Sequence, residues 1–323
     1  MKKILGIGNA LVDVLAQVEN EKMLSELELP KGSMQLIDAG QYRRIQACFA
    51  SLDTQRTTGG SACNTVLTIA HLGGRTGLIG KTGRDEAGTF FADSFESHGV
   101  ATRLLKHDSL PTGVASTFIT PDGQRTFGTY LGAAATLTAD DVRREWFEGY
   151  NYFYIEGYLV QNHDLIRRAV TTAHEAGLTV CIDLASYNIV QADRDFFGEL
   201  LQMTDIVFAN EQEAAAFTGT DDALYNLEIL SRLCRIAVVK IGKKGVWVRS
   251  GNGMTHCPAR EVPIVVDTTA AGDYFSAGFL HALSEGGSLQ DCAKLGSLLA
   301  GHIIEVVGTA LPPETWQQIK ASI

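Results

Sequence analysis

The sequence lacks any cluster of basic side chains. Its 27 Lys and Arg residues are outnumbered by 37 Asp and Glu residues, so the net charge is -10 at pH 7. A cationic face supplies most of the affinity of proteins for DNA and RNA. We therefore expect no nucleic-acid partner.

The sequence also lacks a cysteine framework and a membrane-spanning segment. The six cysteines are far apart and form no CxxC pair, which favours reduced thiols and a cytoplasmic protein. The opening MKKILGIGNALVDVLAQV begins like a signal peptide, but Gly6, Gly8, Asn9 and Asp13 interrupt its apolar run. We interpret it as a first strand. No apolar stretch is long enough to cross a bilayer, so no membrane partner is expected.

Internal repeats, low-complexity tracts and long Pro- or Ser-rich linkers are absent as well. The chain has 323 residues, of which 45% are hydrophobic, and this is enough to build a sizeable core. The sequence therefore predicts one domain over residues 1–323.

What the sequence does contain is a regular alternation of strands and helices. From residue 150 onward, strand-like segments read YFYIEG, LTVCIDL, DIVFAN, IAVVKIG and VPIVVD, mostly with helical segments between them. This pattern predicts an α/β protein with a mostly parallel sheet and helices on both faces. Ligands of such sheets bind beyond the carboxyl ends of the strands. At those ends stand Glu156, Asp183, Asn210 and Asp267, with Gly242 closing the remaining strand.

A hairpin interrupts this alternation in the first half of the chain. The alternating segments TGVASTFIT and RTFGTYLG flank PDGQ, and the pair Asp122-Gly123 is typical of a tight hairpin turn. We expect the hairpin to join strands near residues 12–18 and 33–38 in a small sheet outside the main one. This lid would be formed from about residues 12–38 and 111–132.

The segment DTTAAGDYFSAG at 267–278 joins a predicted strand to a predicted helix. Small residues at such a turn let backbone N–H groups approach a phosphate at the positive end of the helix dipole. Asp273 suits a general base that takes a proton from a hydroxyl group. Alternatively, it only stabilises the helix dipole. Asp267 is expected to cap the turn or to organise a cation and its waters.

Two motifs resemble one protein family. DTTAAGD resembles the DTxGAGD signature of the ribokinase-like (PfkB) carbohydrate and nucleoside kinases, and TTGGSACNT resembles their N-terminal glycine motif. The hairpin, an NEQE strand end and a GKKG turn lie between them in the family order. Within the family, GIGNALVDVLA, KGSMQLID, PDGQRTFGTYLGAA and FANEQEA are most similar to adenosine kinases and similar bacterial sugar kinases.

The resemblance implies a ribokinase-like α/β fold with a small β-sheet lid. It implies an ATP-dependent phosphotransferase that acts on the hydroxymethyl group of a ribonucleoside, adenosine being favoured, or of a sugar such as ribose or fructose. The cofactors would be ATP and Mg²⁺, with a monovalent cation such as K⁺ as a further candidate. The partner would be the small-molecule substrate, and the protein a monomer or homodimer.

The resemblance also implies roles for individual residues. Asp273 would be the catalytic base, the N–H groups of Ala271 and Gly272 the anion hole beside Ala270, and Arg125 would close over the transferred phosphate. The residues implied on the acceptor side are Asn9 and Asp13 for the sugar hydroxyls, Gly59, Gly60, Ser61 and Asn64 for the pocket floor, and Gln35 and Tyr158. Those implied on the nucleotide side are Asn210, Lys240, Gly242, Gly245, Thr268 and Ser297, with Glu213 holding Mg²⁺ through water.

The chain departs from the family pattern at two positions. Ala270 stands where most relatives have glycine, so either its φ is ordinary or the loop is slightly altered. Lys240 stands where threonine is common, which indicates a direct phosphate contact or a shifted nucleotide. Glu213 could instead be only a first-turn helix carboxylate.

Other interpretations remain at this point. GIGNAL begins a GxGxxG dinucleotide motif, but position 11 is Leu and no helix follows, so the motif is incomplete. A non-catalytic nucleoside- or sugar-binding protein could share the fold. An adenosine pocket needs an apolar cover for the base, for which the candidates are Phe127, Tyr130, Tyr158 and Leu159.

Overall fold

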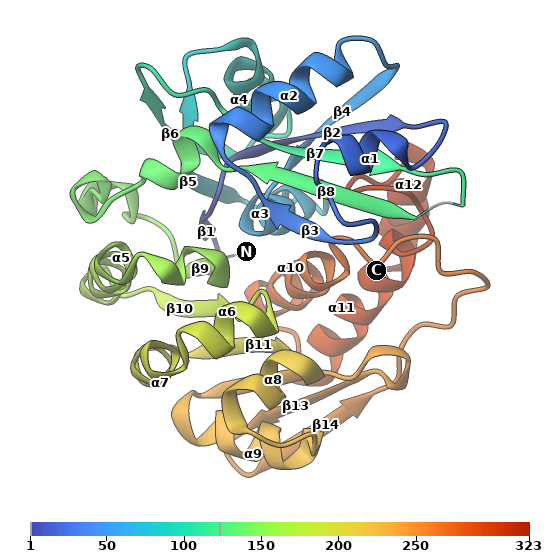
Figure 1. Ribbon diagram of the computed structural model, residues 1–323. Coiled ribbons are helices and arrows are strands. Elements are labelled where there is room, and N and C mark those ends of the chain that lie inside the picture. Colours follow the sequence, from blue (N-terminus) through green and yellow to red (C-terminus); the bar gives the residue numbers. More distant parts are fainter. Residues whose placement is uncertain (1, 123) are drawn as a thin grey trace.

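The computed structural model describes residues 2–122 and 124–323 and contains a nine-stranded sheet at its centre (Figure 1). In sheet order the strands are β14 (Gly253–Cys257), β13 (Val246–Ser250), β12 (Ile236–Lys240), β11 (Ile206–Asn210), β10 (Thr179–Asp183), β9 (Tyr152–Glu156), β1 (Ile4–Ile7), β5 (Thr76–Gly83) and β6 (Ala101–His107). Neighbours from β12 to β6 are parallel, and β13 and β14 add an antiparallel edge. The predicted mostly parallel sheet is confirmed.

Helices cover both faces of this sheet because its central strands are apolar on both sides. Every residue of β1 and β9 is buried, as expected for strands between two helix layers. The helices are α1 (Lys22–Glu26), α2 (Ala39–Phe49), α3 (Ser61–His71), α4 (Glu86–Ser97), α5 (His163–Glu175), α6 (Tyr187–Ala192), α7 (Arg194–Gln202), α8 (Glu211–Thr218), α9 (Ala223–Leu233), α10 (Ala271–Ser284), α11 (Leu289–Ile303) and α12 (Pro313–Ser322).

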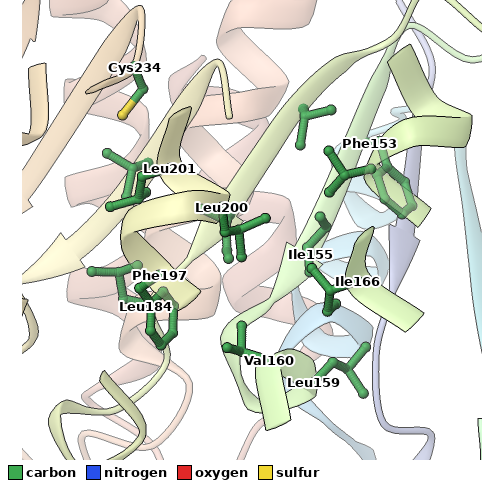
Figure 2. Packing of buried hydrophobic residues seen from close by; sticks show 14 of the residues in the cluster. Phe153, Ile155, Leu159, Val160, Ile166, Leu184, Phe197, Leu200, Leu201 and Cys234 are labelled. Atoms are coloured by element: carbon green, nitrogen blue, oxygen red, sulfur yellow. The ribbon is translucent and has the colours of Figure 1, made fainter. Parts of the chain in front are cut away.

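The two faces form separate hydrophobic clusters, as the alternation of side chains along a strand requires. Phe153 and Ile155 of β9 pack with side chains of α5, α7 and α9, and Figure 2 shows part of this cluster. Tyr152 and Tyr154 of the same strand belong to the other cluster, which includes side chains of α3, α10 and α11. Helix α10, which carries Asp273, is therefore fixed on one face of the sheet.

A five-stranded sheet lies beside the main one (Figure 1). Its order is β3 (Met34–Leu36), β8 (Arg125–Tyr130), β7 (Gly113–Ile119), β2 (Leu11–Gln17) and β4 (Thr54–Gly59). The expected hairpin is confirmed, since β7 and β8 pair antiparallel, while Gly123 lies outside the described residues. The expected strands near 12–18 and 33–38 are present as β2 and β3. Strand β4 was not predicted, because its sequence TQRTTG is polar.

The predicted strand VPIVVD is wrong. Residues 262–267 form no strand, and Ile264, Val265 and Val266 are 71%, 55% and 50% exposed. In this segment, Val266 and Asp267 donate their backbone N–H groups to the carbonyl of Ile304, which lies in no strand. β-branched residues fit a pleated sheet only where a neighbouring strand accepts them, and here none does.

None of the helices in the described part of the chain is long and apolar enough to cross a membrane.

Helices α10 and α11 approach closely because glycines face each other between them. A Cβ atom on Gly278 would lie 2.7 Å from the carbonyl oxygen of Leu295 and 2.8 Å from the nitrogen of Gly296. A Cβ atom on Gly296 would lie 2.8 Å from the carbonyl oxygen of Phe275. In both cases the obstacle is backbone, which cannot rotate away.

We predict that Gly278→Ala lowers the free energy of unfolding by about 1–3 kcal/mol, because the added methyl group forces the two helices apart. The matched control is Gly198→Ala in α7, where nothing lies within 4 Å of the added atom. There alanine should stabilise the helix by about 0.5–1 kcal/mol. Urea denaturation of both variants measures the difference, and equal stabilisation of the two would contradict the close packing.

Candidate active site

The carboxyl ends of the central strands bring polar side chains to one edge of the main sheet. Glu156, Asp183, Asn210 and Lys240 are the last residues of β9, β10, β11 and β12. The N-terminal half of α10 lies at the same edge: Ser276 Oγ donates to Asp183 at 3.4 Å, and Lys240 Nζ lies 3.1 Å from where a Cβ of Gly272 would stand. The prediction holds for Glu156, Asp183 and Asn210. It is wrong for the other two positions, because Lys240 rather than Gly242 ends β12 and Asp267 follows no strand.

Asp273 lies in the first turn of α10, beside the first turn of α3. Its Oδ1 accepts a hydrogen bond from Ser61 Oγ at 2.7 Å, and its Oδ2 accepts one from Asn64 Nδ2 at 2.9 Å. Both donors belong to the first turn of α3. Burial raises the pKa of Asp273 to about 6, although these two hydrogen bonds oppose the shift. The carboxyl group can therefore exchange a proton near neutral pH.

Asp267 organises the loop that leads into α10. Its Oδ1 accepts hydrogen bonds from the N–H of Thr269 at 3.1 Å and from Thr269 Oγ1 at 2.8 Å, and its Oδ2 accepts one from Gly308 N–H at 2.9 Å. It also pairs with Arg125 of β8. Asp267 thus caps the turn. The Arg125 guanidinium is held against the loop, and its buried Nη2 has no partner among the described residues.

The backbone donors at the start of α10 differ from those that the resemblance implies. The N–H of Ala271 donates to the carbonyl of Thr268 at 3.2 Å, so it is occupied within the loop. The N–H groups of Gly272 and Asp273 have no acceptor in the described part of the chain. An anion at this helix terminus would meet the N–H groups of Gly272 and Asp273 rather than that of Ala271.

Ala270 has left-handed backbone geometry, with φ 60° and ψ 4°. Of the two alternatives, an ordinary φ or an altered loop, the first is wrong. The loop keeps a conformation that glycine adopts freely, and the alanine Cβ there is strained.

On the acceptor side, Asn9 and Asp13 flank the start of β2. Gly59 lies against Asp13, because a Cβ on this glycine would come within 2.1 Å of Asp13 Oδ1. Thr309 Oγ1 donates to Asp13 Oδ2 at 3.4 Å. Burial raises the pKa of Asp13 to about 7, and the charge of Asp273 adds to the shift. Gly60 N-caps α3 with a positive φ of 99°.

A cavity of about 620 Å³ adjoins Asn9. Of the four candidates for an apolar cover, Tyr158 and Leu159 line it, together with Leu131 and Ala134. Phe127 and Tyr130 do not, and Tyr130 instead stacks on Tyr42 with 4.6 Å between ring centroids. Gln35 is exposed on the edge strand β3, within the five-stranded sheet.

Asn210 and Glu213 form a capping box at the start of α8. Asn210 N–H and Nδ2 donate to the two oxygens of Glu213 at 2.8 and 2.6 Å, and Asn210 Oδ1 accepts from the N–H of Glu213 at 2.8 Å. Burial, followed by the charge of Asp183, raises the pKa of Glu213. The described residues contain no group of three or more His, Cys, Asp or Glu side chains placed to hold a metal ion.

Lys240 and Asp183 form a buried ion pair in the same region. The distance from Lys240 Nζ to Asp183 Oδ2 is 2.9 Å, and the side chains are 15% and 7% exposed. Burial lowers the pKa of Lys240, but the charges of Asp183 and Glu213 outweigh it and the net shift is upward. Lys240 therefore stays cationic beside Gly272. Sequence reasoning did not assign Asp183 a role in the site, although its position at a strand end was visible.

The remaining residues predicted for the nucleotide side lie around a tight turn. Gly242 and Gly245 have positive φ values of 56° and 99°, and a Cβ on Gly245 would lie 2.0 Å from the carbonyl oxygen of Cys257. Ser297 Oγ of α11 contacts Cys257 Sγ at 3.9 Å, which places Ser297 near this turn. Thr268 is exposed in the loop before α10.

Comparison with known proteins finds similarity over the whole chain. The profile of the pfkB family carbohydrate kinases matches residues 48–316. An adenosine kinase from Saccharomyces cerevisiae is 28% identical over 95% of this chain and 96% of its own length. The crystal structure of adenosine kinase from Sinorhizobium meliloti has a TM-score of 0.89 and 35% identity, covering 100% of this chain and 99% of the other. A probable sugar kinase from Rhizobium etli has a TM-score of 0.88 and 32% identity, covering 99% and 98%.

We predict that Ala270→Gly raises the free energy of unfolding by roughly 0.5–1 kcal/mol, because relief of the left-handed strain exceeds the entropy cost of glycine. The control is Ala282→Gly inside α10, where the same change should cost about 1 kcal/mol. Urea denaturation compares the two variants. A loss of stability in Ala270→Gly would show that the alanine is not strained.

Proposed function

Because this chain belongs to the PfkB family of carbohydrate kinases, whose members phosphorylate alcohol groups, we propose that it transfers the γ-phosphate of ATP to the hydroxymethyl group of a ribonucleoside, with adenosine favoured. The observation that carries the proposal is the position of Asp273. It lies in the first turn of α10, where its carboxylate accepts hydrogen bonds from Ser61 and Asn64 and is close enough for its charge to act on Asp13 and Lys240.

Asp273 acts as the general base in this proposal. A pKa of about 6 leaves its carboxyl group mostly ionised at neutral pH yet basic enough to take a proton from the attacking hydroxymethyl group. The hydrogen bonds from Ser61 and Asn64 orient the carboxylate. Asn9 and Asp13 hold the sugar hydroxyls, and the bonds that Asp13 accepts are strong when its carboxyl group is ionised, since hydrogen bonds to a charged acceptor are the strong ones.

Negative charge on the transferred phosphate is offset by groups that surround the start of α10. The N–H groups of Gly272 and Asp273 point out of the helix terminus. Lys240 supplies a buried positive charge, and the partnerless Nη2 of Arg125 supplies a further donor. Of the two interpretations of Lys240, its place beside Gly272 favours the direct phosphate contact.

The charge of the site fits a divalent cation. Asp183 and Glu213 are buried acids and Asp273 is a half-buried one, and the three share one ammonium group, that of Lys240. We propose that Glu213 and Asn210 hold Mg²⁺ through water, since Mg²⁺ keeps several waters in protein sites. Bound Mg²⁺ would neutralise phosphate charge. A monovalent cation such as K⁺ is a further proposal, supported only by the family resemblance.

The remaining proposals concern the whole molecule. The five-stranded sheet would be the lid of a single domain covering residues 1–323, and the paired Arg125 and Asp267 connect that sheet to the loop before α10. The turn around Gly242 and Gly245, with Ser297 and Thr268, would contact the nucleotide. The free thiols support a cytoplasmic location. We further propose a monomer or homodimer with a small-molecule partner.

The acceptor is a nucleoside in this proposal because the cavity beside Asn9 is large enough for a base and has Tyr158 and Leu159 in its wall. A sugar kinase of the same family is the alternative, favoured by the likeness to the probable sugar kinase. The deciding experiment measures ADP release from Mg-ATP with adenosine, other nucleosides, ribose and fructose. Saturable turnover with adenosine supports the proposal. Turnover with sugars alone would identify the acceptor as a sugar instead. Binding without turnover would identify a non-catalytic binding protein.

We predict that Asp273→Asn lowers kcat by about 10²–10⁴-fold and changes the affinity for the acceptor only a few-fold, because the amide cannot accept the proton. In the unsubstituted enzyme kcat should fall as pH drops below about 6, since Asp273 is protonated there. The control is Asp291→Asn, a first-turn aspartate of α11 outside the site. If both variants kept most of their kcat, Asp273 would serve only the helix dipole.

A further inference from the structure

Glu156 is a buried carboxylate to which the proposed mechanism gives no role. It ends β9 at the centre of the main sheet and is 1% exposed. No Lys, Arg or His in the described part of the chain forms an ion pair with it. Burying a carboxylate costs free energy unless hydrogen bonds satisfy it. Its partners should therefore explain why it is there.

All the partners of Glu156 are N–H donors, and they come from two separate segments. The backbone N–H and the Nδ2 of Asn9 donate to Oε1 at 2.9 and 2.5 Å. The backbone N–H of Ala62 donates to Oε2 at 3.0 Å. Asn9 lies between β1 and β2, whereas Ala62 belongs to the first turn of α3. One carboxylate thus joins both segments.

Two glycines allow these segments to come so close. A Cβ on Gly8 would lie 2.4 Å from Glu156 Oε2, and a Cβ on Gly60 would lie 2.0 Å from the carbonyl oxygen of Asn9. Gly60 also leaves α3 without a capping side chain. Glu156 Oε2 supplies the missing acceptor from another strand, at the helix end where negative charge is favoured.

The two segments carry the groups that face the acceptor and the base. Asn9 is the proposed contact of the sugar hydroxyls, and the first turn of α3 carries Ser61 and Asn64, which hold Asp273. We propose that Glu156 is a positioning residue that sets the separation between Asn9 and the first turn of α3, and thereby the affinity for the acceptor. This inference rests on the proposed function.

Only a carboxylate can serve all three donors. Glutamine keeps the size of the side chain but offers one oxygen, and its NH₂ group would face an N–H group of Asn9 or Ala62. At least one buried donor then loses its acceptor, and the two segments move apart. The proposed ATP site should not change, because its residues Lys240 and Asn210 are held by other partners.

The test measures kcat, the KM for the acceptor and the KM for ATP in Glu156→Gln. We expect the acceptor KM to rise about tenfold or more, because a buried donor is left unpaired, while the ATP KM stays within about twofold and kcat within a few-fold. Gly8→Ala is the second variant. It leaves the carboxylate in place but pushes a methyl group against Oε2, and should give the same pattern.

The control is Asp205→Asn, at the start of β11 and so at the opposite end of the sheet. Asp205 Oδ2 also accepts a backbone N–H from another strand, that of Val180 at 2.9 Å. This variant should lower the melting temperature without changing either KM. If Glu156→Gln and Gly8→Ala behaved like this control, Glu156 would be only structural and the inference would be wrong.

The same measurements separate the inference from the function on which it rests. An unsubstituted protein with no turnover on any acceptor contradicts the proposed function. An active unsubstituted protein whose acceptor KM is unchanged in the variants contradicts only the role of Glu156. If Glu156→Gln does not fold, Gly8→Ala decides by the same criterion.

Discussion

Buried acidic groups that lack matching cations are the constraint on which this site depends. Burial raises the pKa of Asp13 and Glu156 to about 7 and that of Asp273 to about 6, so each binds its proton more tightly in the folded state than in the unfolded chain. The stability that these groups contribute is present at low pH and is lost as pH rises through these values. At neutral pH Asp273 is therefore mostly ionised and Asp13 and Glu156 are partly ionised, although burial disfavours the charged form of each. Neutral N–H and O–H donors, rather than Lys or Arg, hold most of them.

The elements that supply those donors could be predicted from the sequence, because their signals are local. The small residues of DTTAAGD and TTGGSACNT indicate helix starts near an anion, and the structure has α10 and α3 there. The alternating segments around PDGQ gave the hairpin of β7 and β8. Helix starts and hairpin turns depend on neighbours in the chain, so one sequence is sufficient to find them.

The features that were missed depend on contacts between distant segments. VPIVV has the composition of a strand, yet no neighbouring strand accepts it, while polar β4 becomes a strand because β2 pairs with it. The N–H of Ala271 is taken by Thr268 through a turn that spacing does not reveal. Glu156 was visible as a strand end, but its three donors come from residues far away in the sequence.

The ion pair between Arg125 and Asp267 has a consequence for the order of events at this site. Arg125 belongs to the five-stranded sheet, and Asp267 fixes the loop before α10 through Thr269 and Gly308. An anion that attracts the guanidinium competes with Asp267 for it, and so weakens the connection between sheet and loop. By thermodynamic linkage, displacement of the sheet must then alter the affinity for that anion by the same factor. If the sheet moves as the proposed lid, that movement and occupancy of the helix terminus are coupled.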